Sequence, residues 1–324
     1  MDSKDLFSAL INETDAFRQG LTRRQFMVLQ AKSALVFSIG ASGLLIPQKA
    51  FTDALPDIVV ATGRPGPATR AAVGLLGGMG SFVKPGNKVV IKPNMSFARG
   101  PESATNTDPE VVRELVAMCK EAGAGNIRVL DHPLRPNELC IEGVSDACRV
   151  FGGDIVQALE DNDFYRETKL SDAVKFKKTD IMKDVLDADV LIAAPVAKSH
   201  SSTGVSLSLK GMMGLILNRT VMHWRYDLST AIVDLSTYLK PQLVVIDSTR
   251  VLSTNGPGGP GKVLKKDTII ASKDMVAADA TATQMFEWYG KKMQPRQVKH
   301  IRIAHERGLG RMDVDNLITK KVQV

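Results

Sequence analysis

Apolar runs and amphipathic segments alternate along this chain. Short runs rich in β-branched residues are followed by longer segments whose apolar residues recur at helical spacing. The runs 187–198 and 241–249 are almost continuously apolar, which is typical of strands covered on both faces in a parallel sheet. Strands are therefore predicted at 57–63, 87–94, 126–132, 187–198, 241–249 and 267–272.

Helices are predicted between and after these strands. The clearest covers 108–124, where Asp108 is the cap, Pro109 occupies the first helical position and apolar residues follow at helical spacing. The others are predicted at 67–83, 137–151, 206–217, 274–289 and 295–307. Because strands and helices alternate, residues 55–324 are expected to form a single α/β domain with a mainly parallel sheet and helices on both faces.

The first 54 residues have the features of an export signal. The pair Arg23-Arg24, followed two residues later by Phe26, resembles the twin-arginine signal of bacterial export. The apolar stretch 33–46 is shorter than the roughly 20 residues that a membrane span needs. We expect a signal peptide cleaved after Ala54, the twin-arginine translocation machinery as a partner, a periplasmic location and no stable membrane span after cleavage. The alternative is an amphipathic N-terminal helix or an uncleaved anchor.

Charge and aromatic content limit the choice of partners. The formal charge of the 324 residues is +7, but lysines and arginines are mostly interleaved with acids. Aromatic residues make up only 5% of the chain, which is little for stacking on bases. No nucleic-acid partner is therefore expected.

The three cysteines do not have the spacing of a metal cluster. Cys119, Cys140 and Cys148 include no C-x-x-C pair, and three thiolates cannot complete a four-cysteine iron–sulfur cluster. On one helix, Cys140 and Cys148 would be about 10 Å apart along the axis, which is too far for a disulfide. Three mostly buried thiols are expected, and the disulfide state of Cys140 and Cys148 stays open.

Polar residues gather at the predicted carboxyl ends of the strands. In α/β sheets, ligands bind beyond the carboxyl ends of parallel strands. If the strands are parallel neighbours, these polar side chains converge on one site. They are Lys92, Asn94, Asp131, His132, Lys198, His200 and Asp247.

Residues 190–226 contain no acid at all. Their lysines and arginines are therefore not compensated locally, and such side chains bind phosphate or carboxylate as point charges or forks. The alternative is that acids from elsewhere in the fold pair with these cations. The predicted ligand-binding residues are Lys92, Asn94, Lys198, Lys210, Arg219 and Asn255.

Two histidines and an aspartate are the candidates for catalysis. His200 and His223 have the chemistry of a general acid or base, and Asp247 would orient one of them or a metal. The two histidines, with Asp131 and His132, are also the candidates for a divalent metal site. The chain lacks the H-x-x-x-H and H-E-x-x-H spacings, and a lone histidine is more often structural.

Two further features are assigned structural roles. His300 and His305 lie five residues apart on a predicted helix and are expected on its surface. The glycine-rich segment 255–262 is followed by a strand, and Val263 stands where a Walker loop needs Ser or Thr. A turn or a flap over the site is expected instead of a nucleotide loop, with Asn255 facing the ligand.

Ten segments, among them "VVIKPNMS" at 89–96 and "ADVLIAAPVAKSH" at 188–200, together resemble the domain of unknown function family 362 of bacteria and archaea. The family has no settled activity. Some members carry ferredoxin-like cysteine motifs and are described as iron–sulfur proteins, and this chain lacks those motifs. The resemblance carries over the positions Lys92, Asn94, Asp108, Asp131, His132, Lys198, His200, Lys210, Arg219, His223, Asp247, Asn255, Asp274 and Asp279.

Two hypotheses follow for the function. The first is an exported protein whose site at the strand ends binds a cofactor or an anion, and which could be an enzyme acting on a phosphate- or carboxylate-bearing ligand. The alternative is a non-catalytic redox or iron–sulfur accessory protein that is exported folded with a redox partner. The sequence names neither the substrate nor the cofactor.

Overall fold

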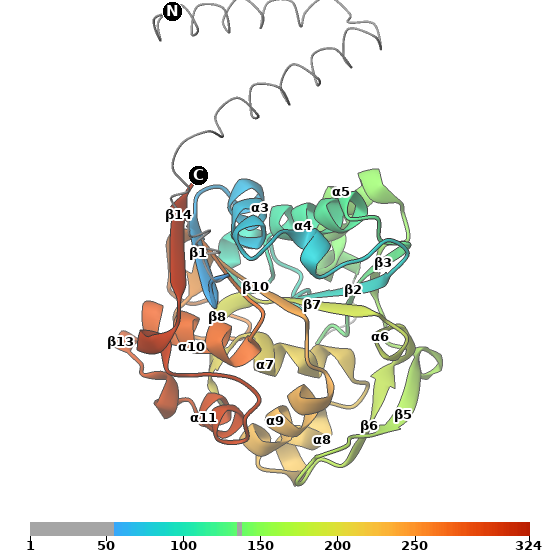
Figure 1. The fold of residues 1–324 in the computed structure, drawn as a ribbon. Coiled ribbons are helices and arrows are strands. Elements are labelled where there is room, and N and C mark those ends of the chain that lie inside the picture. The colour runs from blue at the N-terminus through green and yellow to red at the C-terminus, as the bar shows by residue number, and fades with distance from the viewer. Residues whose placement is uncertain (1–54, 135–137) are drawn as a thin grey trace, which may run out of the picture. The chain divides into compact units, whose positions relative to one another are not determined.

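A sheet of ten strands organises the part of the chain that this computed structural model describes, residues 55–134 and 138–324 (Figure 1). The predicted signal peptide, residues 1–54, lies outside the described residues. The main path of the sheet is β14 (Thr319–Gln323), β1 (Ile58–Thr62), β11 (Val263–Ser272), β10 (Leu243–Leu252), β7 (Val190–Ala194), β2 (Lys88–Pro93), β3 (Asn126–Asp131) and β4 (Val156–Ala158). Off this path, β8 (Val196–His200) pairs with β10, and β9 (Gly204–Ser206) pairs with β8.

Most neighbouring strands of this sheet are parallel. The pairs from β10 through β7, β2 and β3 to β4 are all parallel, as are β1 with β14 and β10 with β8. The exceptions are β11, which is antiparallel to both β1 and β10, and β9, which is antiparallel to β8. The predicted α/β fold with a mainly parallel sheet is confirmed.

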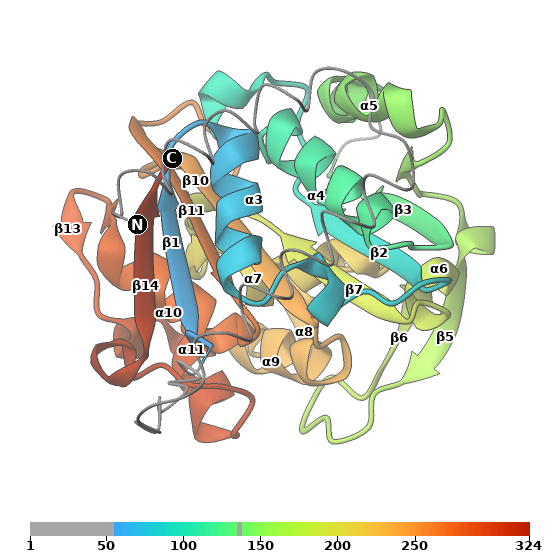
Figure 2. The same ribbon diagram turned by 45° about the horizontal axis from the view of Figure 1, so that its top comes forward.

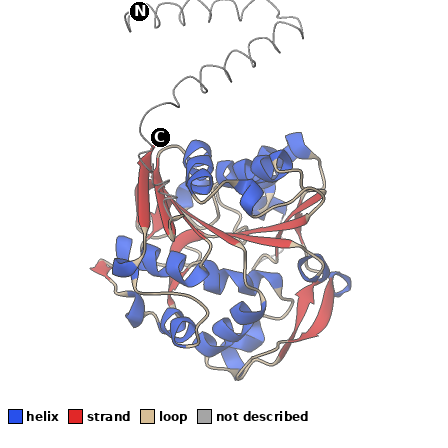
Figure 3. Ribbon diagram, viewed as in Figure 1, coloured by secondary structure: helices blue, strands red, loops and turns tan. Residues whose placement is uncertain are grey.

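Helices cover both faces of the sheet (Figure 3). On one face lie α3 (Pro65–Leu75), α4 (Pro109–Glu121) and α5 (Glu142–Cys148), and α3 runs beside α4 (Figure 2). The other face carries α7 (Ser208–Gly211), α8 (Thr220–Arg225), α9 (Leu228–Tyr238), α10 (Met275–Met285) and α11 (Lys299–Glu306). Every helix within the described ranges is too short or too polar to cross a membrane.

Side chains of each strand alternate between two apolar cores. Val89 and Ile91 of β2 belong to the core that contains residues of α3 and α4, whereas Val90 belongs to the core with α9, α10 and α11. Each such buried aliphatic side chain stabilises the fold by about 1.5–3 kcal/mol. The sheet is therefore covered on both faces, as the continuous apolar runs predict.

Helix α4 begins where the sequence predicts. Asp108 is its N-cap, and the Asp108 carboxylate accepts a hydrogen bond from the Glu110 N–H at 3.0 Å. Pro109 takes the first helical position, where no N–H is needed. The helix ends at Glu121, shortly before Gly123, which has a positive φ of 85°.

Pro195 divides the predicted strand 187–198 into β7 and β8. Because proline has no N–H, it cannot donate to a neighbouring strand. Its carbonyl accepts from the Asp247 N–H at 2.8 Å, and β8 continues along β10 beyond the end of β7. Lys198 and His200 therefore lie on β8 itself and not after the end of a strand.

Other elements differ in length from the prediction. The first helix ends at Leu75, because Gly77 and Gly78 follow with positive φ values. Short α-helical and 3-10 turns replace one continuous helix within 137–151 and within 206–217. The periodicity did not predict β4, β9, β14, α8, α9, or the separate hairpin of β5 (Tyr165–Lys169) and β6 (Lys178–Met182).

All three cysteines are buried, as expected. Cys119 packs in the core between the sheet and α4, and burial raises its pKa to about 12. Burial likewise raises the pKa of Cys148 to about 11. These thiols stay protonated at neutral pH, which makes them poor nucleophiles.

Candidate functional site

One cavity of about 230 Å³ lies at the carboxyl ends of β2 and β3 and beside β8. Eight of the predicted site residues line it: Lys92, Asn94, Asp131, Lys198, His200, Lys210, Arg219 and His223. The strand order explains this, because β7, β2 and β3 are parallel neighbours. The other lining residues are Ser96, Phe97, Leu134, Ser206, Gly211, Met213, Gly214 and Pro257.

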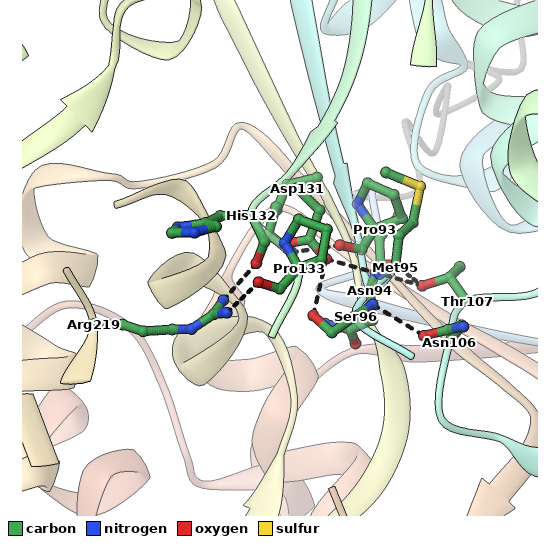
Figure 4. Close-up of polar contacts among 12 residues, drawn as sticks. Pro93, Asn94, Met95, Ser96, Asn106, Thr107, Asp131, His132, Pro133 and Arg219 are labelled. Atoms are coloured by element: carbon green, nitrogen blue, oxygen red, sulfur yellow. Dashed lines mark hydrogen bonds and ion pairs between the residues drawn. The ribbon is translucent and has the colours of Figure 1, made fainter. Parts of the chain in front are cut away.

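Lys92 and Asp131 form a buried ion pair in the wall of this cavity. The Lys92 Nζ lies 3.0 Å from Asp131 Oδ1, and neither side chain is more than 2% exposed. The second carboxylate oxygen accepts from the Met95 N–H at 2.8 Å (Figure 4). Burial lowers the pKa of Lys92, while the Asp131 carboxylate opposes that shift. Because it is already paired, Lys92 is less available to a ligand than the sequence suggests.

Gly214 allows this ion pair to form. A Cβ at Gly214 would lie 2.3 Å from Asp131 Oδ1 and 2.5 Å from Lys92 Cε, closer than any real contact. The Gly214 carbonyl also accepts from the His132 N–H at 2.9 Å. The 3-10 turn Met212–Leu215 is thereby held against the end of β3.

Lys198 is buried in the cavity wall, and no acidic side chain of residues 55–134 or 138–324 forms an ion pair with it. Its side chain is 3% exposed, and its Nζ donates to the Thr105 carbonyl at 2.5 Å. The ammonium lies 5.1 Å from the centre of the Phe97 ring, a cation–π distance. Burial lowers the pKa of Lys198 to about 7.

The Lys210 ammonium has an even weaker hydrogen-bond partner. It is 9% exposed, and its Nζ contacts the Met213 Sδ at 3.5 Å, a weak acceptor. Burial, with a smaller effect of the Arg219 charge, lowers the pKa of Lys210 to about 8. Within the residues that the structure describes, neither Lys198 nor Lys210 forms an ion pair.

Asp279 holds the short helix that carries Lys210. From α10, its carboxylate accepts from the Ser208 N–H at 2.8 Å, the Ser208 hydroxyl at 2.6 Å and the Leu209 N–H at 2.9 Å. These N–H groups belong to the first turn of α7 and would otherwise be unpaired. Burial raises the pKa of Asp279 to about 7, although these hydrogen bonds favour its anion.

Arg219 does not offer the free fork that the sequence suggests. Its two terminal nitrogens donate to the carbonyls of His132 and Pro133, the latter at 2.6 Å (Figure 4). It therefore fastens the start of α8 to the segment after β3. Its charge still faces the cavity, but the predicted bidentate contact with an anion is corrected to a positioning role.

His200 is held as a neutral hydrogen-bond donor. Its Nδ1 accepts from the Ser202 N–H at 3.1 Å, so in the neutral ring the proton is on Nε2. Burial, together with the nearby Lys210 charge, lowers the pKa of His200 to about 2. Because Nδ1 is already an acceptor and Nε2 carries the proton, the neutral ring offers the cavity a hydrogen-bond donor, and a proton-transfer role for His200 stays a prediction.

His223 is the better placed of the two histidines for proton transfer. It lies on α8, one helical turn after Arg219, and is exposed at the cavity. Partial burial and then the Lys210 charge lower its pKa, which favours the neutral ring. A neutral, exposed imidazole can accept a proton from a ligand.

Asp247 lies outside the cavity, contrary to its predicted catalytic role. It is 2% exposed, and its carboxylate accepts from the Asp108 N–H at 2.7 Å and from both the N–H and the hydroxyl of Thr249. Burial raises its pKa to about 6. Its oxygens tie β10 to the start of α4, so Asp247 orients backbone and not a histidine.

Asn255 is not among the residues that line the cavity. It is exposed, and its amide donates to the Pro260 carbonyl at 3.1 Å within the loop that joins β10 to β11. This loop connects antiparallel strands, as a turn and not as a nucleotide loop. The loop lines the cavity with Pro257 and not with Asn255.

The candidate metal ligands do not gather around one point. Among the described residues, no group of three or more His, Cys, Asp or Glu side chains is placed to hold a metal ion. Asp131 is paired with Lys92, and the His132 Nδ1 is 3.0 Å from the Ile216 carbonyl, outside the cavity lining. The predicted set of Asp131, His132, His200 and His223 is therefore not assembled in this structure.

The sequence predicted His300 at the surface, and this prediction is wrong. His300 is fully buried in α11, with Ile301 and Ala304. Neither ring nitrogen has a hydrogen-bond partner among the described residues. Burial lowers the pKa of His300 to about 3, so the ring is neutral. Its position four residues before Ala304 is the helical spacing that could have revealed this burial. His305 is half-buried, with Nδ1 3.0 Å from the Gly310 carbonyl.

Sequence reasoning missed Phe97 and Met213, which line the cavity, and gave no role to Asp279, which supports it. Met213 lies three residues after Lys210, a helical spacing that could have placed the two side chains together. Phe97 follows Asn94 closely, but nothing local pairs it with Lys198. Asp279 is 71 residues from Ser208, and only the family resemblance pointed to it.

Comparison with known proteins identifies the family to which this chain belongs. The chain belongs to the domain of unknown function family DUF362, whose model matches residues 89–284. The resemblance expected from the sequence is therefore confirmed, whereas the twin-arginine signal stays a prediction.

Two particular proteins are similar to this chain. The thylakoid-associated protein sll1697 of Synechocystis sp. is 28% identical over 223 residues, which cover 65% of this chain and 67% of that protein. Among solved structures, the lactate racemase apoprotein from Thermoanaerobacterium thermosaccharolyticum is similar with a TM-score of 0.41 and 11% sequence identity. That similarity covers 67% of this chain and 54% of the racemase chain, so this chain spans about half of that structure.

Proposed function

We propose that the cavity binds a small anionic molecule that carries a phosphate or a carboxylate group. The observation that supports this is the burial of Lys198 and Lys210 in one cavity without a carboxylate partner in the described part of the chain. A buried, unpaired ammonium raises the free energy of the folded protein. An anion bound between two such groups offsets that cost, which gives the site its affinity.

Each remaining group of the cavity has a place in this proposal. Lys198 and Lys210 balance the ligand's charge, and the Nε2–H of His200 donates a hydrogen bond to it. Asn94 uses its Oδ1 to accept from the Val196 N–H at 3.0 Å, so its amide nitrogen is the part that can face the ligand. The volume of about 230 Å³ is below that of sites for drug-sized molecules, which suits a small anionic group.

An enzymatic role would use the same cavity. Lys198, with its pKa lowered to about 7 by burial, is poised to give or take a proton near neutral pH. His223 lines the same cavity and is exposed. A reaction on the bound anion would therefore move its proton through Lys198 or His223.

Calorimetric titration of the full chain with inorganic phosphate, sulfate and acetate tests the anion site. Lys198→Met and Lys210→Met should each weaken binding about tenfold or more, because each removes a charged partner worth about 1.5–3 kcal/mol. Lys240→Met, at an exposed lysine outside the cavity, is the matched control and should leave affinity unchanged. Thermal unfolding of each variant verifies that the fold is intact.

The alternative hypothesis, a non-catalytic accessory protein, predicts a different result for the same purified protein. A non-catalytic accessory protein would bind none of the three anions and would instead copurify in fixed ratio with a protein partner. Equal affinities of the unsubstituted chain and both lysine variants would also refute the anion site. Native mass spectrometry of the protein taken from its own compartment distinguishes a bound small molecule from a bound protein.

Export through the twin-arginine route is part of this proposal. It is supported by the pair Arg23-Arg24 and Phe26 ahead of a short apolar stretch. Replacing Arg23 and Arg24 with lysine should leave the protein in the cytoplasm, as followed by cell fractionation. A protein that still reaches the periplasm after this substitution is not exported by that route.

A further inference from the structure

Trp224 is an exposed aromatic side chain close to the cationic cavity. Its side chain is 84% exposed, whereas the other tryptophan, Trp288, is 1% exposed and donates its indole N–H to the Thr283 carbonyl. Leu134, after β3, is also half-exposed. Trp224 and Leu134 line one hollow, so both side chains are available to a ligand that enters it.

A second hollow connects Trp224 with the cationic cavity. It has a volume of about 410 Å³ and is lined by Leu134, Arg219, Thr220, His223 and Trp224. Three of these residues, Leu134, Arg219 and His223, also line the cationic cavity. The two spaces therefore adjoin. The inner part is lined by the buried Lys198 and Lys210, and the outer part adds the exposed Trp224 to Leu134, Arg219 and His223.

The volumes indicate how a ligand would divide between the two parts. The inner cavity, at about 230 Å³, suits an anionic group with a few further atoms. A larger ligand would extend past Arg219 and His223, and the next side chains it meets are Leu134 and Trp224. An indole face favours a flat aromatic partner, through stacked or edge-to-face contact.

We propose that the natural ligand carries an aromatic group, which packs on Trp224 and Leu134 while its anionic group lies in the cavity of Lys198 and Lys210. This inference rests on the proposed anion site and adds the class of ligand to it. Arg219 and His223 separate the two parts and set the distance between the ring and the charge. Trp224 is then a specificity-determining residue.

Pairs of probes that differ only by a ring test this inference on the full chain. Phenyl phosphate is compared with methyl phosphate, and phenylacetate with acetate, by calorimetry and by tryptophan fluorescence. The aromatic member of the preferred pair should bind about five- to tenfold more tightly and should change the emission of Trp224. The choice between the two pairs also tells a phosphate ligand from a carboxylate ligand.

Substitution of Trp224 assigns the effect to this residue. Trp224→Ala should abolish the preference for the aromatic probe and leave the affinity for its small counterpart unchanged. Trp224→Phe should restore part of the preference. Since Trp288 is buried, the emission change should disappear in both variants.

The outcomes separate this inference from the proposed function. If methyl and phenyl phosphate, and likewise acetate and phenylacetate, bind equally, the anion site stands and the aromatic subsite is refuted. If no probe binds, the anion site itself fails and the subsite fails with it. If benzyl alcohol, which has no charge, changes Trp224 emission as strongly as phenyl phosphate does, Trp224 is a general apolar surface and the inference is wrong.

Discussion

Lys198 and Lys210 are buried in this cavity, and the part of the chain that the structure describes gives them none of the carboxylate partners that buried lysines ordinarily have. Lys92 shows the ordinary solution, because Asp131 lies 3.0 Å from its ammonium. The lysines of the cavity therefore have two different roles. Lys92 builds the wall, while Lys198 and Lys210 carry charge that is left for a ligand.

Gly214→Ala should destabilise the protein by about 1–3 kcal/mol, because the added Cβ would overlap the Lys92–Asp131 pair. Chemical unfolding with urea measures the change. Gly74→Ala is the matched control, since a Cβ at that position of α3 meets open space. That control should stabilise the protein by about 0.5–1 kcal/mol. If Gly214→Ala leaves the free energy of unfolding unchanged, the Lys92–Asp131 ion pair does not lie beside Gly214 as described.

Helix α7 has four residues, far fewer than an isolated helix needs for stability. It forms because its first N–H groups donate to Asp279 of α10 and because the Leu209 carbonyl accepts from the Ser236 hydroxyl of α9 at 3.1 Å. Lys210 is the next residue after Leu209. The position of its ammonium therefore depends on two helices that are distant in sequence.

Asp279→Ala should cost about 2–4 kcal/mol of stability, because it leaves buried donors of Ser208 and Leu209 without an acceptor. It should also weaken anion binding, since Lys210 loses its support. Thermal unfolding and calorimetric titration measure the two effects. Asp163→Ala, at an exposed position, is the control and should change neither. A variant as stable as the unsubstituted chain would refute the role assigned to Asp279.

Across the whole molecule, the sheet order brings residues from distant segments to one edge. Because β7, β2 and β3 are parallel neighbours, Lys92, Asp131 and the segment that carries Lys198 meet although they lie 39 to 106 residues apart along the chain. The short β8 then extends past the end of β7 on β10. The cavity is thus a product of strand order and not of any local motif.

The sequence predicted the long apolar strands of the sheet because apolar runs report burial directly, but it missed the short strands β4, β9 and β14. The acid-free block pointed to Lys198 and Lys210. It could not predict what each polar group contacts. Arg219 was expected to bind an anion, but backbone carbonyls occupy its terminal nitrogens. Asp247 lies on β10, but its carboxylate accepts hydrogen bonds from Asp108 and Thr249 and does not line the cavity. Such pairings depend on loops whose paths periodicity does not determine.

Anion affinity should fall as the pH rises. Burial lowers the pKa of Lys198 to about 7 and that of Lys210 to about 8, and each ammonium is charged below its pKa and neutral above it. Sulfate keeps its charge over this range, so its dissociation constant should increase at least about tenfold between about pH 6 and about pH 9. Calorimetry at several pH values measures this. Affinity that is constant or that increases with pH would contradict the assignment of these lysines.

Crystals of the protein grown with selenate would test the central claim most directly. Selenate has the shape and charge of sulfate, and anomalous scattering from selenium locates it without reference to any prior coordinates. The account predicts a selenate in the cavity, within hydrogen-bond distance of the Lys198 and Lys210 ammonium groups, and its loss in Lys210→Met. Selenate bound only at surface lysines, with the cavity holding none, would contradict the account.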